Sequence, residues 1–171
     1  SKNKSALIKA RYHMFAKALE GAYVTLGQNK KLMLNRNRSI TIGDENWKVF
    51  ECAICDDCGR VAVAGKEVDG KLEFANSSYD PEIEYYLLRD SRDIDLDLDE
   101  EDEDDTEEIG KNDYILCSKC GALIHESLKA DPPCTCGLTH YVKIRKARKS
   151  GSHGDGKCPS CNFGTFKTFY L

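Results

Sequence analysis

The stretch Phe50-Glu51-Cys52-Ala53-Ile54-Cys55-Asp56-Asp57-Cys58-Gly59 holds three of the chain's nine cysteines, each separated from the next by two residues. Two cysteines at this spacing in a tight turn can direct both sulfur atoms at one point about 2.3 Å away, as tetrahedral zinc requires. The glycine after Cys58 tolerates the turn backbone. We therefore expect a zinc knuckle here, with Cys55 and Cys58 as ligands, and we expect Cys52 not to bind the metal.

The other cysteines repeat this pattern further along the chain. They form the pairs Cys117-x-x-Cys120, Cys134-x-Cys136 and Cys158-x-x-Cys161. An odd total and closely spaced pairs argue against a disulfide framework, whereas four pairs are enough for two complete four-thiolate sites. We therefore expect two zinc ions, held by Cys55, Cys58, Cys117, Cys120, Cys134, Cys136, Cys158 and Cys161.

The spacing leaves more than one pairing of these half-sites open. Joining the pair at 117 and 120 to the pair at 134 and 136 closes a loop of usual zinc-ribbon length. The first and last pairs would then staple the two halves of the chain together. We favour this nested arrangement, and an interleaved one is the alternative. Closed four-thiolate sites have no open coordination position, so both are expected to be structural and not catalytic.

Outward from the cysteines, short apolar or alternating runs bounded by Asn, Gly and Asp indicate β-strands. They lie at 31–34, 39–42, 47–50, 60–64, 71–74, 84–89, 114–116 and 139–145. Between Ala6 and about Val24, apolar residues recur at helical spacing. The predicted fold class is small α+β and mostly β: a zinc-ribbon or knuckle module with an N-terminal helix and two zinc sites.

Charge divides the chain into segments. Residues 93–108 hold twelve of the 29 acidic residues and no basic one, so the remaining residues carry −4 + 12 = +8. Such a segment is typical of a solvated tether. We predict an N-terminal helix at 1–27, a first zinc-knuckle lobe at 28–89, an acidic linker at 90–112 and a second zinc-ribbon lobe at 113–171.

A basic body with an acidic tether indicates a polyanionic partner, most plausibly nucleic acid. The strongest basic run supplies the candidate contacts Lys143, Arg145, Lys146, Arg148 and Lys149. A solvated edge strand protected by charge is the alternative interpretation of this run.

The sequence suggests no catalytic couple. It contains no run of eighteen apolar residues and no signal segment at its amino end, so we expect a cytoplasmic protein with no membrane partner.

Two segments resemble one family. Residues 10–23 match the pattern R-x-H-x-F-x-[RK]-x-x-x-G, and 50–59 match F-E-x-x-x-C-x-x-C-G followed by a short strand and a glycine. Both patterns resemble the cysteine-rich C-terminal region of large DEAD/DEAH-box-type superfamily-two DNA helicases, the MrfA-like and DISARM-type enzymes. Many of those relatives carry a further cysteine pair soon after the first segment, and residues 24–37 of this chain have none.

The resemblance implies an accessory module of an ATP-dependent DNA helicase in DNA repair or phage defence. Its partners would be single-stranded or forked DNA and the motor domains of the same or an associated polypeptide, and its location would be nucleoid-associated. Arg11 and His13 become candidate contacts by their place in the motif. The motor's own motifs are missing, so this chain alone is not expected to hydrolyse ATP. A zinc-ribbon adaptor for other proteins is the alternative function, followed by a thiol redox or metal-sensing protein.

Overall fold

The computed structural model describes residues 21–28, 30–76, 80–89, 112–127, 134, 136, 140–150 and 155–169. Within these residues the chain forms fourteen β-strands and almost no helix, which confirms the prediction of a mostly β fold. No helix in this part of the chain has the length and apolar character needed to cross a membrane.

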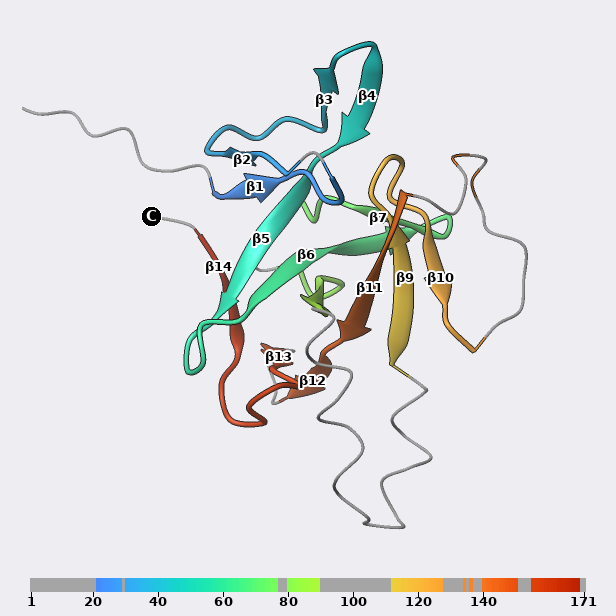
Figure 1. Cartoon of the computed structure of the whole chain (residues 1–171). Helices are drawn as coiled ribbons and strands as arrows, with labels where there is room; N and C mark the ends of the chain where they lie inside the picture. Colours follow the sequence, from blue (N-terminus) through green and yellow to red (C-terminus); the bar gives the residue numbers. More distant parts are fainter. Residues whose placement is uncertain are drawn as a thin grey trace, which may run out of the picture.

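Ten strands form one antiparallel sheet (Figure 1). Its main path runs through β10 (Leu123–His125), β9 (Asp113–Cys117), β11 (Tyr141–Lys146), β8 (Glu84–Leu88), β6 (Val61–Val68), β5 (Phe50–Cys55), β1 (Tyr23–Val24) and β2 (Leu32–Met33). Off this path, β14 (Phe166–Thr168) pairs with β5, and β7 (Lys71–Glu73) pairs with β6. Strands from before and after the predicted linker therefore share one sheet, and the linker itself, except for Asn112, lies outside the described residues.

Two separate hairpins accompany the sheet. β3 (Ser39–Ile42) pairs with β4 (Glu45–Lys48), and this hairpin stands beyond the start of β5 in Figure 1. β12 (Arg148–Ser150) pairs with β13 (Asp155–Lys157). β12 follows β11 after the single buried residue Ala147, so the basic run predicted from the sequence continues from the sheet into this second hairpin.

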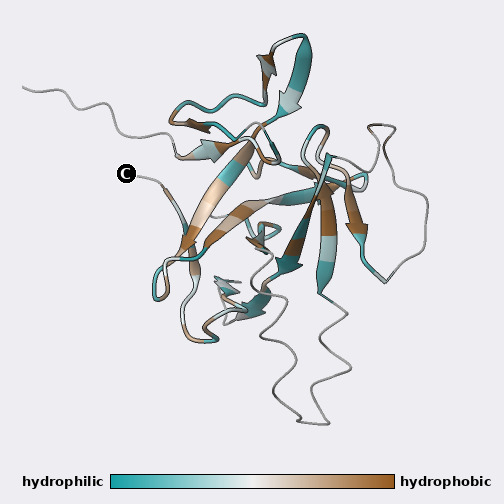
Figure 2. Ribbon diagram, viewed as in Figure 1, coloured by the Kyte–Doolittle hydropathy of each residue, from teal (hydrophilic) through white to brown (hydrophobic). Residues whose placement is uncertain are grey.

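The central strands β5, β6 and β8 are largely buried on both faces, and Figure 2 shows apolar residues over part of β5 and β6. Because successive side chains of a strand point to opposite faces, β6 contributes Ala62 and Ala64 to one core and Val63 to the other. The first core also contains Ala53, Cys55, Tyr85, Leu87, Cys158 and Phe166. The second contains Leu26, Phe50, Leu72, Tyr86, Leu116, Leu123 and Ile144.

The end predicted for the N-terminal helix is wrong. Residues 1–20 lie outside the described residues, but Tyr23 and Val24 form a strand and not the last turn of a helix. Tyr23 is fully buried and pairs with Met33 on one side and Glu51 on the other. Gly21 has φ 135°, outside the helical region. Two adjacent apolar residues at 22 and 23 are compatible with the buried face of a helix and with a buried strand. Pairing of Tyr23 with its two neighbouring strands makes this segment a strand.

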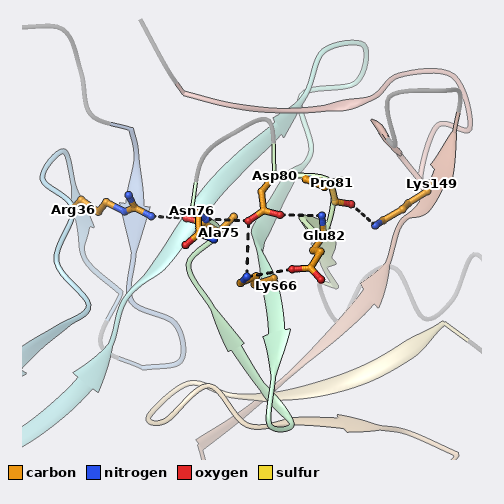
Figure 3. A network of polar contacts seen from close by, with 8 residues as sticks. All are labelled: Arg36, Lys66, Ala75, Asn76, Asp80, Pro81, Glu82 and Lys149. Carbon is orange, nitrogen blue, oxygen red and sulfur yellow. Dashed lines mark hydrogen bonds and ion pairs between the residues drawn. The ribbon is translucent and has the colours of Figure 1, made fainter.

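A buried carboxylate fixes the connection between β7 and β8 (Figure 3). Asp80 is 8% exposed and accepts hydrogen bonds from the backbone amides of Glu82, at 3.0 Å, and Asn76, at 3.2 Å. These amides hold the pKa of Asp80 below its usual value, and the nearby Lys66 and Lys149 act in the same direction. The carboxylate therefore links residues on the two sides of this connection, Asn76 and Glu82.

Two cations from distant segments hold the ends of the same connection (Figure 3). The guanidinium Nη2 of Arg36 donates to the carbonyl oxygen of Ala75 at 2.6 Å, and Nζ of Lys149 donates to that of Pro81 at 3.0 Å. The loop before β3 and the β12–β13 hairpin are thus both fastened to the β7–β8 connection.

Leucine truncations test where the core lies. Leu116 is fully buried in β9, whereas Leu32 in β2 is 70% exposed. Leu116→Ala should lower the free energy of unfolding by about 2–5 kcal/mol because it removes core contacts and leaves a cavity. The matched change Leu32→Ala should stay within about 0.5 kcal/mol of the parent. Denaturant unfolding of the metal-loaded chain measures both, and equal losses would contradict this placement of the core.

Candidate metal centres

Three of the four cysteine pairs adopt the same turn. In each, the amide of the residue after the second cysteine donates to the carbonyl of the first: Gly59 to Cys55 at 3.1 Å, Gly121 to Cys117 at 2.8 Å and Asn162 to Cys158 at 3.0 Å. The donating residue has a positive φ every time, of 72°, 82° and 59° respectively. Glycine and asparagine accept this conformation most readily. The residue type after each pair thus permits the turn that directs two sulfurs to one side.

The first cluster joins Cys55 and Cys58 to Cys158 and Cys161, and all four sulfur atoms lie within 4.8 Å of one another. The Sγ atoms of Cys55 and Cys161 are 3.7 Å apart, and those of Cys58 and Cys158 are 3.8 Å apart. A tetrahedron of thiolates about 2.3 Å from a central ion has edges of about 3.8 Å. The separations therefore match a four-thiolate metal site, in the nested pairing.

β5 and β14 position the first cluster. Cys55 is the last residue of β5 and pairs with Phe166 of β14. Just beyond the strands, the amide of Asp56 donates to the carbonyl of Thr165 at 3.1 Å, and the Asp56 carboxylate accepts from the amide of Thr165 at 2.8 Å. These bonds hold the two knuckles face to face across a sequence separation of about one hundred residues.

Gly164 permits the close approach of these knuckles. A Cβ atom at this position would lie 2.5 Å from Sγ of Cys55 and 2.6 Å from Cβ of Asp57. The amide of the same residue donates to Sγ of Cys161 at 3.3 Å. A larger residue would therefore displace a ligand sulfur, so glycine here belongs to the site although it contributes no ligand atom.

The second cluster joins Cys117 and Cys120 to Cys134 and Cys136, again with all sulfur atoms within 4.8 Å of one another. Cys117 is the last residue of β9, and it pairs with Tyr141 at the start of β11. The Tyr141 hydroxyl lies 3.0 Å from Sγ of Cys134. The strand that follows the last pair of this cluster therefore also contacts one of its sulfurs.

Hydrogen bonds favour one thiolate in each cluster. Burial alone would raise the pKa of Cys55, but the amides of Cys58 and Asp57 lower it to about 7. Burial opposes ionisation of Cys134 in the same way, and the Tyr141 hydroxyl with the amide of Cys136 lowers its pKa to about 7. Thiolates and not thiols bind metal. Each cluster therefore contains one cysteine that ionises readily, whereas burial raises the pKa of Cys117 and Cys158 to about 12.

Cys52 lies outside both clusters. It is 6% exposed in the middle of β5, where it pairs with Val63. Burial, followed by the neighbouring Glu51 carboxylate, raises its pKa to about 11. A cysteine that stays protonated inside a sheet behaves as a small apolar residue.

The structure places the predicted nucleic-acid contacts less favourably. Arg11 and His13 lie outside the described residues. On β11, Lys143 pairs with Glu126 at 3.1 Å, Arg145 with Asp113 at 2.8 Å and Lys146 with Glu84 at 2.6 Å. Arg148 makes contacts of its own, and Lys149 donates to the carbonyl of Pro81. The basic run therefore forms a ridge with much of its charge compensated, and its role in binding stays a prediction.

Sequence reasoning missed these carboxylates because they come from other strands. Glu84 lies in β8, Asp113 in β9 and Glu126 just after β10, far from residue 145 in the sequence. Sheet pairing of β11 with β8 and β9 brings them beside the basic run. The sequence carried no local signal of this compensation.

Comparison with known proteins gives one family. The family model described as the YjiV N-terminal domain matches residues 32–170, which includes all four cysteine pairs. No curated protein and no solved structure matches the chain. The family match therefore covers both clusters and nearly the whole described sheet.

Trp47, the only tryptophan, should report on the second cluster alone. Trp47 is 4% exposed, and the centre of its ring lies 5.3 Å from the centre of the His140 ring. Lys119, which stands between Cys117 and Cys120, places its Nζ 5.9 Å from the centre of the Trp47 ring. Cys120→Ser should loosen this contact and move the tryptophan emission to longer wavelength, because water then reaches the indole.

Cys161→Ser in the first cluster is the matched control, and fluorescence spectra of both variants provide the measurement. The control should leave the emission maximum near that of the parent. An equal shift in the two variants would mean that the clusters do not fold independently enough for Trp47 to distinguish them.

Proposed function

The chain belongs to the family of YjiV N-terminal domains, and we propose that it is a structural zinc-binding module of an ATP-dependent DNA helicase. In this proposal it holds a nucleic-acid strand or braces the motor domains, and it performs no reaction itself. The two clusters each hold one zinc ion.

The observation that carries the proposal is the pair of four-cysteine clusters. Four thiolates complete the coordination of zinc and leave no position for water or substrate, as is typical of structural sites. Binding of zinc to such sites in finger peptides is worth on the order of 10–16 kcal/mol, which is enough to stabilise a small β fold. One cluster also joins segments that lie about one hundred residues apart in the sequence.

The helicase assignment rests on sequence resemblance at 10–23 and 50–59. The second of these segments forms β5 and the first knuckle, where Phe50 and Glu51 are 2% and 1% exposed. In this interpretation the motif serves the fold of the module, and contacts to DNA come from the surface around it. Motor domains would be supplied elsewhere in the same polypeptide or by a partner.

One observation favours a protein adaptor as the second candidate. Phe163, beside the Cys158–Cys161 knuckle, is 85% exposed, and the exposed Asp57 lies close by on the facing knuckle. An exposed aromatic ring beside a carboxylate suits a basic, partly apolar protein surface better than a phosphate backbone.

Metal analysis tests the structural part of the proposal. The purified chain should hold about two zinc ions, and Cys161→Ser should hold about one because the second cluster remains complete. Cys52→Ser is the matched control and should keep two. Plasma mass spectrometry gives the stoichiometry, and little metal with reversible disulfides would support the redox alternative instead.

Nucleic-acid binding tests the helicase part. Fluorescence anisotropy with forked and single-stranded DNA should give affinities that fall steeply with salt, since phosphate contacts release counterions. The same titrations give the slope of the logarithm of the binding constant against the logarithm of the salt concentration. A zinc-loaded chain that binds neither DNA at low salt would contradict this function and favour the adaptor.

A further inference from the structure

One group of cations on this molecule has no carboxylate partner in the part of the chain that the structure describes. It lies in residues 30–38, Lys-Lys-Leu-Met-Leu-Asn-Arg-Asn-Arg, which we call the cationic arm. We propose that the cationic arm, and not the ridge on β11 and β12, is the surface that binds nucleic acid. This inference rests on the proposed function and names the residues through which it acts.

Charge is the first argument. Lys30, Lys31, Arg36 and Arg38 carry four positive charges, and no acidic residue occurs from residue 21 to residue 43. All four are exposed. The described ion pairs include three cations of β11 and none of the cationic arm. A polyanion would therefore meet unscreened charge on the arm and compensated charge on the ridge.

Hydrogen bonds fix the backbone of the arm at both ends, so its exposed side chains are held in position before a partner binds. The amide of Lys31 donates to Oγ1 of Thr25 at 2.9 Å, and its carbonyl accepts from the amide of Thr25 at 3.1 Å. The carbonyl of Arg38 accepts from the amide of Val49 at 3.0 Å. Anchors at both ends reduce the conformational entropy that binding would otherwise cost.

Arg36 bends the arm toward the sheet. Its guanidinium carbon lies 5.2 Å from the centre of the Phe74 ring, and Nη2 donates to the carbonyl of Ala75. Neither partner carries a negative charge. The positive charge of Arg36 therefore still contributes to the field around the arm, while its side chain holds the loop in place.

The apolar and amide side chains of the arm indicate nucleic acid rather than another anion. Leu32 and Leu34 are 70% and 52% exposed, and Asn35 and Asn37 are also exposed. Proteins that contact the minor groove or open base steps combine Arg, Lys and Asn with exposed aliphatic side chains in this way. An anionic membrane surface is typically bound by an amphipathic helix, whereas the arm consists of the short strand β2 and a loop.

The occupant we assign is duplex or forked DNA. Lys30, Lys31 and Arg38 contact phosphates along one strand, and the two leucines contact sugars and base edges. β2 is the edge strand at the end of the main sheet path, so no further strand of that path covers the arm.

A triple alanine variant tests the charge contribution. Lys30→Ala, Lys31→Ala and Arg38→Ala together should reduce the salt slope on forked duplex DNA by roughly 2–3 and weaken binding at low salt by at least about tenfold. The control removes three lysines elsewhere, Lys71→Ala, Lys157→Ala and Lys167→Ala, and should change both values far less. Zinc content and the unfolding midpoint check that each variant is folded.

A second variant separates the contribution of the apolar contacts to DNA binding from that of the positive charges. Leu32→Ser with Leu34→Ser should weaken binding several-fold and leave the salt slope unchanged, because no phosphate contact is lost. Vesicles containing phosphatidylserine serve as the competing anionic surface.

The outcomes distinguish the inference from the proposed function. If the parent chain binds forked DNA but the triple variant behaves like its control, the cationic arm is not the binding surface and the proposed function stands. The same holds if Lys143→Ala with Lys149→Ala abolishes binding instead. If the parent binds vesicles and no DNA, both proposals are overturned.

Discussion

The meeting of Cys55 and Cys58 with Cys158 and Cys161 is the contact that joins the last strand of the sheet to β5. Bringing together segments about one hundred residues apart costs on the order of 4 kcal/mol of chain entropy. β14 offers only three residues of pairing with β5 in return. A metal bound by four thiolates would offset that cost several-fold, so in the metal-bound protein coordination would hold the last strand more strongly than its own hydrogen bonds.

The acidic segment interrupts the chain without dividing the sheet. Arg89 and Asp113, which flank it, form an ion pair at 3.3 Å, and both side chains are largely buried. The amide of Arg89 also donates to the carbonyl of Lys143 at 3.2 Å. Both ends of residues 90–112 therefore meet beside β11. The acidic segment is therefore an insertion between two strands of one sheet, and the residues that flank it, Arg89 and Asp113, are held in place.

Local patterns in the sequence predicted the sites better than the fold. Cysteine spacing, with Gly59 or Gly121 after a pair, indicated the turns, and loop length favoured the pairing that the structure has. The spacing could not reveal that β5 continues through Cys52 to Cys55, because the knuckle motif and the strand share the same residues. Tyr141 and Gly164 were also missed, since each acts on a sulfur that its own segment does not contain.

Surface charge shows why composition alone does not reveal which cations lie beside carboxylates in the fold. Residues 143–149 are the densest basic run in the sequence, but residues 143–146 lie in β11 between strands that carry carboxylates. The cationic arm is less dense and lies at the end of the main sheet path, where β2 has one neighbouring strand on that path and residues 21–43 contain no acidic residue. Sheet position therefore determines which cations remain available. β11 lies between two strands that supply carboxylates, whereas the described ion pairs include none with the cations on either side of β2.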